Sequence, residues 1–181
     1  DARLKDALKP VIVMTYDIEN TRTHYFNSRM AKEDPDTEDF FLRDIVRATS
    51  AAPTYFEPFG FQQNLNGSLA THTFVDGGVF ANNPAMLGYT EAKIINDQQD
   101  RLIQVDENNK DANSDAYIVD LRDIAEPFFM LSLGTGSVKK PLSYKRTKKW
   151  GMLTWARPLI DILMQGSADT VDYQIKNLLP P

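Results

Sequence analysis

The chain has 181 residues, a length that suits one domain with its own core and is short for two. Hydrophobic residues make up 42 % and charged residues 25 %, as in soluble globular proteins, and no apolar run approaches the length of a membrane span. The absence of cysteine excludes disulfides and thiolate chemistry, and two histidines leave little for a zinc site. The chain opens on charged residues, with neither a signal-peptide pattern nor an initiator methionine, so we expect that residue 1 is not the native start.

The net charge of −5 is unevenly distributed along the chain. Residues 137–159 contain seven basic residues and no acidic one, and subtracting this +7 from −5 leaves −12 on the remainder. So acidic a remainder argues against a nucleic-acid-binding surface. The basic residues are mixed with tryptophan and tyrosine, a composition that suits a lipid–water interface. A solvated loop and helix start, with the tryptophans packed on the core, is an equally good interpretation. The candidate membrane contacts are Lys145, Arg146, Lys148, Lys149, Trp150 and Trp155.

The first half of the chain predicts strands in hairpins and one helix. Residues 11–16 are β-branched and apolar, as in a buried strand, and turn-forming residues separate them from a return strand at 23–27. Apolar residues at helical spacing predict a helix between Asp39, as N-cap, and Pro53. Asn66-Gly67 is a favoured turn pair and predicts a second hairpin.

The second half predicts two helices, a loop and a strand. An Asn-Asn-Pro sequence should start a helix over residues 85–95, and residues 106–115 are polar, as in an exposed loop. Residues 128–133 resemble a second buried strand, and residues 160–179 carry the stripe of an amphipathic helix. Strands that alternate with helices favour an α/β fold whose sheet is covered on both faces. Ligands of such sheets bind beyond the carboxyl ends of the strands, at Asp17, Asp76 and Gly134 here.

The most informative segment is Asp76-Gly77-Gly78-Val79-Phe80-Ala81-Asn82-Asn83-Pro84. It places a carboxylate at the end of a strand, followed by two glycines and a helix start; Asp-Gly by itself would indicate only a hairpin turn. The whole string resembles the second catalytic block of patatin-like phospholipases. Residues 47–56 and 131–136 resemble two further blocks of that family, in the family's order, so that the resemblance covers about residues 11–140 and leaves the basic segment 137–159 and the helix 160–179 beyond it.

The resemblance implies the C-terminal portion of a three-layer α/β/α domain with a mostly parallel central sheet. It also implies a lipid acyl hydrolase that acts on lipid esters through a Ser-Asp dyad, without metal or cofactor. Asp76 would be the general base, Gly77 and Gly78 would shape its turn, and Asn83 would cap the next helix.

The nucleophilic serine of the family stands in a G-x-S-x-G turn, and this chain has no two glycines four residues apart. The glycine-rich oxyanion block of the family is also missing, and both blocks precede residue 11 in the family's order. We therefore expect that residues 1–181 are an incomplete domain, inactive without its N-terminal half. The alternative is a non-catalytic binding module derived from the same fold. A Ser-His-Asp triad ranks low, because no histidine follows His72.

Two other titratable residues have ordinary explanations. Asp17 should accept hydrogen bonds from the backbone of its own turn. His72 is too far along an extended strand to reach Asp76, since four residues span about 13 Å. We expect it to be a partly exposed strand residue.

Overall fold

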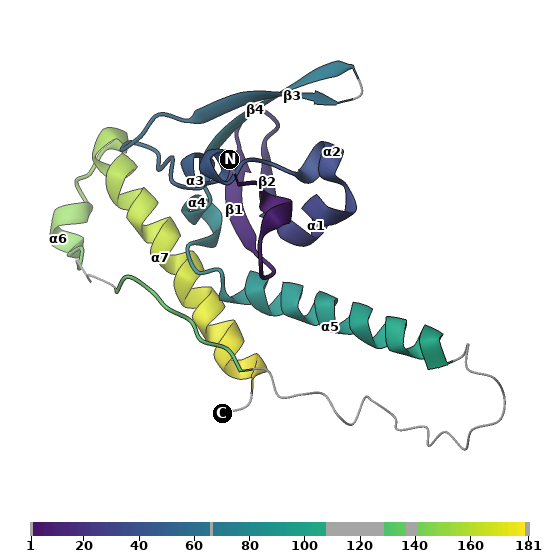
Figure 1. Ribbon diagram of the computed structural model, residues 1–181. Coiled ribbons are helices and arrows are strands. Elements are labelled where there is room, and N and C mark those ends of the chain that lie inside the picture. The colour runs from purple at the N-terminus through teal and green to yellow at the C-terminus, as the bar shows by residue number, and fades with distance from the viewer. Residues whose placement is uncertain (1, 66, 108–128, 137–140, 180–181) are drawn as a thin grey trace.

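A computed structural model describes residues 2–65, 67–107, 129–136 and 141–179 of the chain. Its centre is a four-stranded sheet in the order β2-β1-β4-β3, and every neighbouring pair is antiparallel (Figure 1). The strands are β1 (Ile12–Asp17), β2 (Arg22–Asn27), β3 (Phe59–Leu65) and β4 (Ser68–Asp76).

Two short turns account for the pairing of the outer strands. The turn between β1 and β2 places Asp17 opposite Arg22, and the short connection between β3 and β4 places Leu65 opposite Ser68. Gly67 has φ +88°, a conformation that glycine adopts without steric cost. Both hairpins predicted from the sequence are confirmed.

The prediction of a mostly parallel sheet is wrong for the described part of the chain. Strands joined by connections of a few residues can pair only antiparallel, because parallel pairing needs a crossover of a dozen or more residues. The continuous apolar run of β1, which favoured a parallel strand, has another cause. Helices lie on both sides of this antiparallel strand, so both of its faces are covered.

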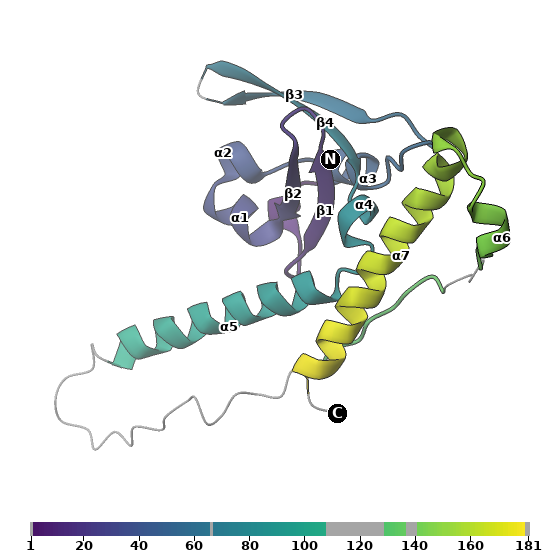
Figure 2. The same cartoon turned by 180° about the vertical axis from the view of Figure 1, so that it is seen from behind.

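The helices are a short 3₁₀ turn, η1 (Leu4–Asp6), followed by α1 (Ser28–Glu33), α2 (Pro35–Glu38), α3 (Leu42–Thr49), α4 (Gly78–Ala81), α5 (Ala85–Glu107), α6 (Tyr144–Thr147) and α7 (Met152–Leu178). In both views α1 and α2 lie on one side of β1 and β2, and α4 and α7 lie on the other side (Figures 1 and 2). The long helices α5 and α7 approach each other near the start of α5 and then diverge.

The hydrophobic core lies on the α1 and α3 side of the sheet. Seven side chains form it, one from η1, four from helical or loop positions and two from strands: Leu4, Phe26, Ala31, Phe40, Ile45, Ala48 and Phe74. Phe26 and Phe74 meet edge to face at 5.4 Å between ring centroids. Each fully buried aromatic side chain of this kind contributes roughly 2–3 kcal/mol through burial.

Several local expectations differ from the structure. The predicted helix starts at Leu42 and not after Asp39, whose carboxylate instead binds Arg3 (3.2 Å) and the backbone N–H of Lys5 (3.0 Å). Residues 129–133 form no strand, and the rest of the predicted strand, Phe128, lies outside the described residues. Most of the predicted loop at 106–115 lies outside them as well, while α5 continues to Glu107.

Candidate active site

Asp76 is the last residue of β4 and stands opposite Thr15 of β1. Its backbone N–H donates to the carbonyl of Ala51 (3.0 Å), which ties the strand end to the segment that follows α3. Its side chain is half-buried, and Oδ1 accepts a hydrogen bond from the backbone N–H of Gly78 (2.7 Å). Within the described part of the chain, Oδ2 accepts no hydrogen bond. One oxygen therefore fixes the orientation of the carboxylate, and the other remains available to accept a hydrogen bond.

Gly77 is required by close contact between backbones. A Cβ at this position would lie 2.3 Å from the carbonyl oxygen of Met14 and 2.7 Å from its Cβ, so no side chain fits. The Met14 carbonyl is itself held by the Thr49 hydroxyl (2.7 Å). The backbone of Gly77 is in the right-handed helical region, with φ −63°. The first glycine of the motif thus allows β1 and the turn to touch, and a positive φ plays no part in it.

The second glycine lies under α7. A Cβ on Gly78 would approach Oδ1 of Asp76 and Cε of Met164 at 3.1 Å each, and Oδ1 of Asn82 at 3.4 Å. Met164 comes from the middle of α7, so this helix covers the turn that carries the candidate base. An open groove continues from Asn82 and Met164 along α7 toward α6.

Asn83 does more than the sequence predicts. Its Oδ1 accepts a hydrogen bond from the backbone N–H of Ala85 (3.0 Å) at the start of α5, which is the predicted capping role. Its Nδ2 also donates to Asp172 of α7 (2.9 Å). The Asn-Asn-Pro segment thereby connects the turn after β4 to both long helices.

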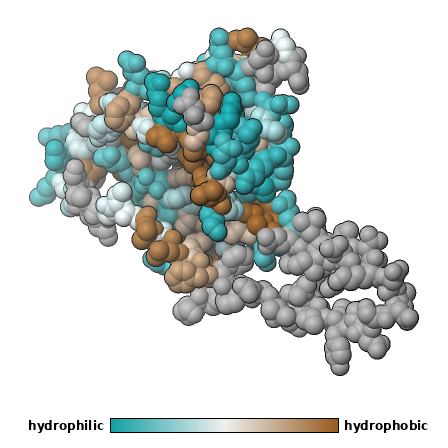
Figure 3. Space-filling view, in the orientation of Figure 1, coloured by the Kyte–Doolittle hydropathy of each residue, from teal (hydrophilic) through white to brown (hydrophobic). Residues whose placement is uncertain are grey.

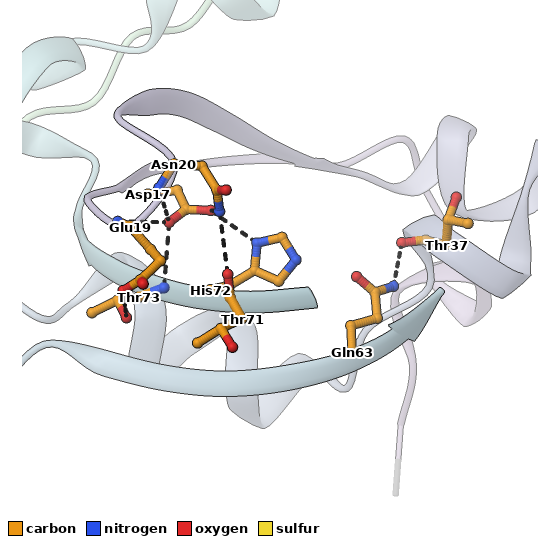
Figure 4. Close-up of polar contacts among 8 residues, drawn as sticks. All are labelled: Asp17, Glu19, Asn20, Thr37, Gln63, Thr71, His72 and Thr73. Carbon is orange, nitrogen blue, oxygen red and sulfur yellow. Dashed lines mark hydrogen bonds and ion pairs between the residues drawn. The ribbon is translucent and has the colours of Figure 1, made fainter. Parts of the chain in front are cut away.

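Asp17 is the centre of a buried polar cluster on β1, β4 and the first hairpin turn (Figure 4). The predicted turn bonds are present, since Oδ1 accepts from the N–H groups of Glu19 (3.1 Å) and Asn20 (3.2 Å). Oδ2 also accepts from Nδ2 of Asn20 (2.7 Å) and lies 2.8 Å from Nδ1 of His72. A carboxylate only accepts hydrogen bonds, so His72 carries its proton on Nδ1 when Asp17 is ionised.

Burial and hydrogen bonding act on these groups in opposite directions. Burial raises the pKa of Asp17, but hydrogen bonds from Asn20, His72 and Thr73 outweigh it and hold that pKa below its usual value. His24, on β2 with its ring 6.4 Å from that of His72, has its pKa lowered to about 4, mainly by burial and then by His72 and Arg22. His72 is only 5 % exposed, so the expectation that it is partly exposed is wrong, whereas His24 is half-buried.

The Asp17–His72 pair has one geometric feature of a catalytic triad, a carboxylate that orients an imidazole. A triad, however, needs the other ring nitrogen to face a serine. Nε2 of His72 is buried and unpartnered among the described residues, and its ring stacks between Phe61 (5.3 Å) and Phe74 (5.6 Å). This pair stabilises the sheet, and it was not predictable from local sequence patterns because its residues are 55 positions apart.

The basic residues lie apart from Asp76. Lys145, Arg146, Lys148 and Lys149 are exposed on and just after α6. Trp150 and Trp155 are half-buried and meet edge to face at 5.1 Å between ring centroids. Among the described residues, no group of three His, Asp or Glu side chains could hold a metal ion. No described helix has the length and apolarity needed to cross a bilayer.

The strand-end aspartate, the two glycines and the helix start lie in a segment that sequence comparison matches to a known family. The sequence model of the patatin-like phospholipase family matches residues 1–89, from η1 through the Asp76 turn to the beginning of α5. The chain belongs to this family.

Plant proteins are among its relatives. The chain is 34 % identical over 183 residues to patatin-like protein 2 of Arabidopsis thaliana, an alignment that covers 97 % of the chain and 41 % of that protein. It is 34 % identical to patatin-like protein 1 of Oryza sativa subsp. indica, with 95 % of the chain and 40 % of that protein covered. The chain therefore spans about two fifths of the length of the curated relatives it matches.

Proposed function

We propose that this chain supplies the general base, Asp76, of a serine hydrolase that cleaves lipid esters through a Ser-Asp dyad. The observation that carries the proposal is the state of the Asp76 carboxylate. It is half-buried at a strand end, anchored through Oδ1 to the N–H of Gly78, with Oδ2 unengaged among the described residues. The nucleophile belongs to a G-x-S-x-G turn that residues 1–181 lack, so it would come from sequence outside them.

Asp76 would transfer protons in both steps of the reaction, acylation of the serine and hydrolysis of the acyl-enzyme. It first accepts the proton of the serine hydroxyl as the serine oxygen attacks the ester carbonyl, and it donates this proton to the alcohol that leaves as the acyl-enzyme forms. It then accepts a proton from the water that attacks the acyl-enzyme, and returns it to the serine oxygen as the fatty acid is released. Anchoring one carboxylate oxygen reduces the orientations that the other can adopt, which favours both transfers.

The rigid surroundings of Asp76 support this role. Its backbone is bound to Ala51, Gly77 is packed on Met14, and Met164 of α7 lies over the turn. A base that must meet a serine from another part of the fold needs such a fixed position, because a displacement of about 1 Å can cost roughly 100-fold in rate.

A fluorophosphonate probe, which forms a covalent bond only with an activated serine, tests the proposal. We expect the protein that carries this chain together with a G-x-S-x-G segment to be labelled, and residues 1–181 by themselves to remain unlabelled. Asp76→Asn should slow the labelling without reducing the amount of folded protein. If the longer protein is not labelled at all, the chain is a non-catalytic module.

A further inference from the structure

The start of α7 and the preceding helix α6 form an exposed corner that is strongly cationic. We define the α6–α7 corner by its exposed residues: Tyr144, Lys145, Arg146, Lys148, Lys149, Met152 and Leu153. Its four positive charges fall within five residues, and no acidic residue occurs from 137 to 159. The remainder of the chain is acidic, so this corner is a local site of attraction for anions.

Two large apolar side chains project from the same corner. Met152 is 89 % exposed and Leu153 is 92 % exposed, although both stand in the first turn of a long helix. In Figure 3, hydrophobic side chains lie over the start of α7 at the upper left, beside hydrophilic ones over α6. Isolated exposed apolar residues are ordinary on protein surfaces. Two adjacent ones at the tip of a cationic turn have the composition of an interfacial membrane anchor.

Two tryptophans pack against each other within this corner. Trp150 and Trp155 pack against each other and flank Met152 and Leu153 in sequence, so the exposed pair projects from a fixed base. Nζ of Lys148 lies 5.7 Å from the ring centre of Tyr144, which keeps that amphipathic ring among the charges.

A groove connects the α6–α7 corner to the candidate active site. The open groove along α7 is lined near the corner by Arg146, Trp150 and Thr154. At its other end it is lined by Asn82 and Met164, the residues next to the Asp76–Gly78 turn. Binding of the α6–α7 corner to a bilayer would place the end of this groove that Arg146 lines close to lipid.

We propose that the α6–α7 corner is a peripheral binding site for anionic phospholipid bilayers. Lys145, Arg146, Lys148 and Lys149 engage the head groups, and Met152 and Leu153 enter the acyl boundary. The charge complementarity of the corner selects an anionic surface, and the exposed pair selects a lipid one. This inference is independent of the catalytic role of Asp76, because binding to a bilayer requires no turnover.

Co-sedimentation with vesicles tests the proposal. The protein carrying this chain is mixed with vesicles of phosphatidylcholine, with or without about one third phosphatidylserine. We expect binding only to the anionic vesicles, and release by high salt. Replacing Lys145, Arg146, Lys148 and Lys149 by glutamine should lower the partition coefficient on the order of 10³-fold, since each basic residue at an anionic surface contributes about 1 kcal/mol.

Two further variants separate charge from apolar insertion. Replacing Lys9, Lys32, Lys93 and Lys176 by glutamine changes the net charge equally at exposed positions away from the corner, and should leave binding unchanged. Met152→Ser with Leu153→Ser should lower binding at least 10-fold while the four charges remain. Hydrolysis of a soluble monomeric ester should be the same in the serine pair and in the matched control as in the wild type, which separates this test from that of Asp76.

Three results would overturn the proposal. The first is equal vesicle binding by the wild type and the corner glutamine variant. The second is an equal loss of binding in the matched control. The third is binding to soluble polyglutamate that is as strong as binding to the anionic vesicles and insensitive to the serine pair, which would assign the corner to an acidic protein partner.

Discussion

Substituting Gly77 by alanine should strongly destabilise the protein, because the space for a side chain is occupied by backbone. The added Cβ would lie 2.3 Å from the carbonyl oxygen of Met14 and 2.5 Å from its carbonyl carbon. Met14 is held in β1 by its pairing with β2 and by the Thr49 hydroxyl. Relief therefore requires that the strand and the turn move apart.

The magnitude follows from this geometry. Overpacking a core costs roughly 1–3 kcal/mol when side chains can adjust. A contact with strand backbone should fall at the upper end, at about 3 kcal/mol, which corresponds to a decrease in Tm of roughly 6–12 °C in a protein of this size.

Circular dichroism melts of the wild type and two alanine variants measure this effect. Gly88→Ala is the matched control, since a Cβ there meets nothing within 4 Å and Gly88 lies inside α5. Alanine is favoured over glycine in a helix by about 1 kcal/mol, so Gly88→Ala should raise Tm slightly. A Gly77→Ala variant that melts with the wild type, or above it, would show that the Met14 backbone does not exclude a side chain at this position.

The polar cluster and the pH dependence of stability give three further predictions. The pKa of His24 is about 4 in the folded state, below its value of about 6.5 in the unfolded state. Between these two pKa values the unfolded state binds more protons than the folded state. The stability that is complete above about pH 6.5 should therefore be lost as the pH falls toward 4. In His24→Phe, the free energy of unfolding measured by urea denaturation should depend less on pH in this range. An unchanged pH dependence would contradict the contribution of His24. The lowered pKa of Asp17 adds stability that is lost only as the pH falls below its unfolded value near 3.8, so the wild type should lose stability in two successive pH ranges. Asp17→Ala should cost about 2–4 kcal/mol of stability at neutral pH, because it leaves His72 and two turn N–H groups unpaired. The control Asp36→Ala changes an exposed aspartate and should cost less than about 0.5 kcal/mol. Equal stabilities of these two variants would contradict a stabilising role for Asp17.

Local signals in the sequence predicted both hairpins and the start of α5, but not the absence of a strand at 129–133. Turn residues at 17–21 and at Asn66-Gly67 marked two hairpins, and Asn83-Pro84 marked the start of α5. The candidate base was found because its chemistry lies in one contiguous segment, from Asp76 to Pro84.

The relationships between distant segments were not predictable in the same way. An apolar strand covered on both faces has the same composition whether its neighbours are parallel or antiparallel, so composition could not give the direction of pairing. The contact of His72 with Asp17 depends on which strands are neighbours, and the contact of Gly77 with Met14 depends on a separation between backbones. The sequence offers a motif for the turn but none for these packing relations.

Ester hydrolysis by Asp76→Asn, in the protein that carries this chain with its serine segment, tests most directly whether Asp76 is the base of a lipid ester hydrolase. Asparagine can still accept the hydrogen bond from Gly78 but is not a base, so the fold should be retained and the chemistry lost. We predict a decrease in kcat of about 10²–10⁴-fold, with KM little changed and Asp36→Asn indistinguishable from the wild type. Turnover by Asp76→Asn equal to that of the wild type would contradict the claim.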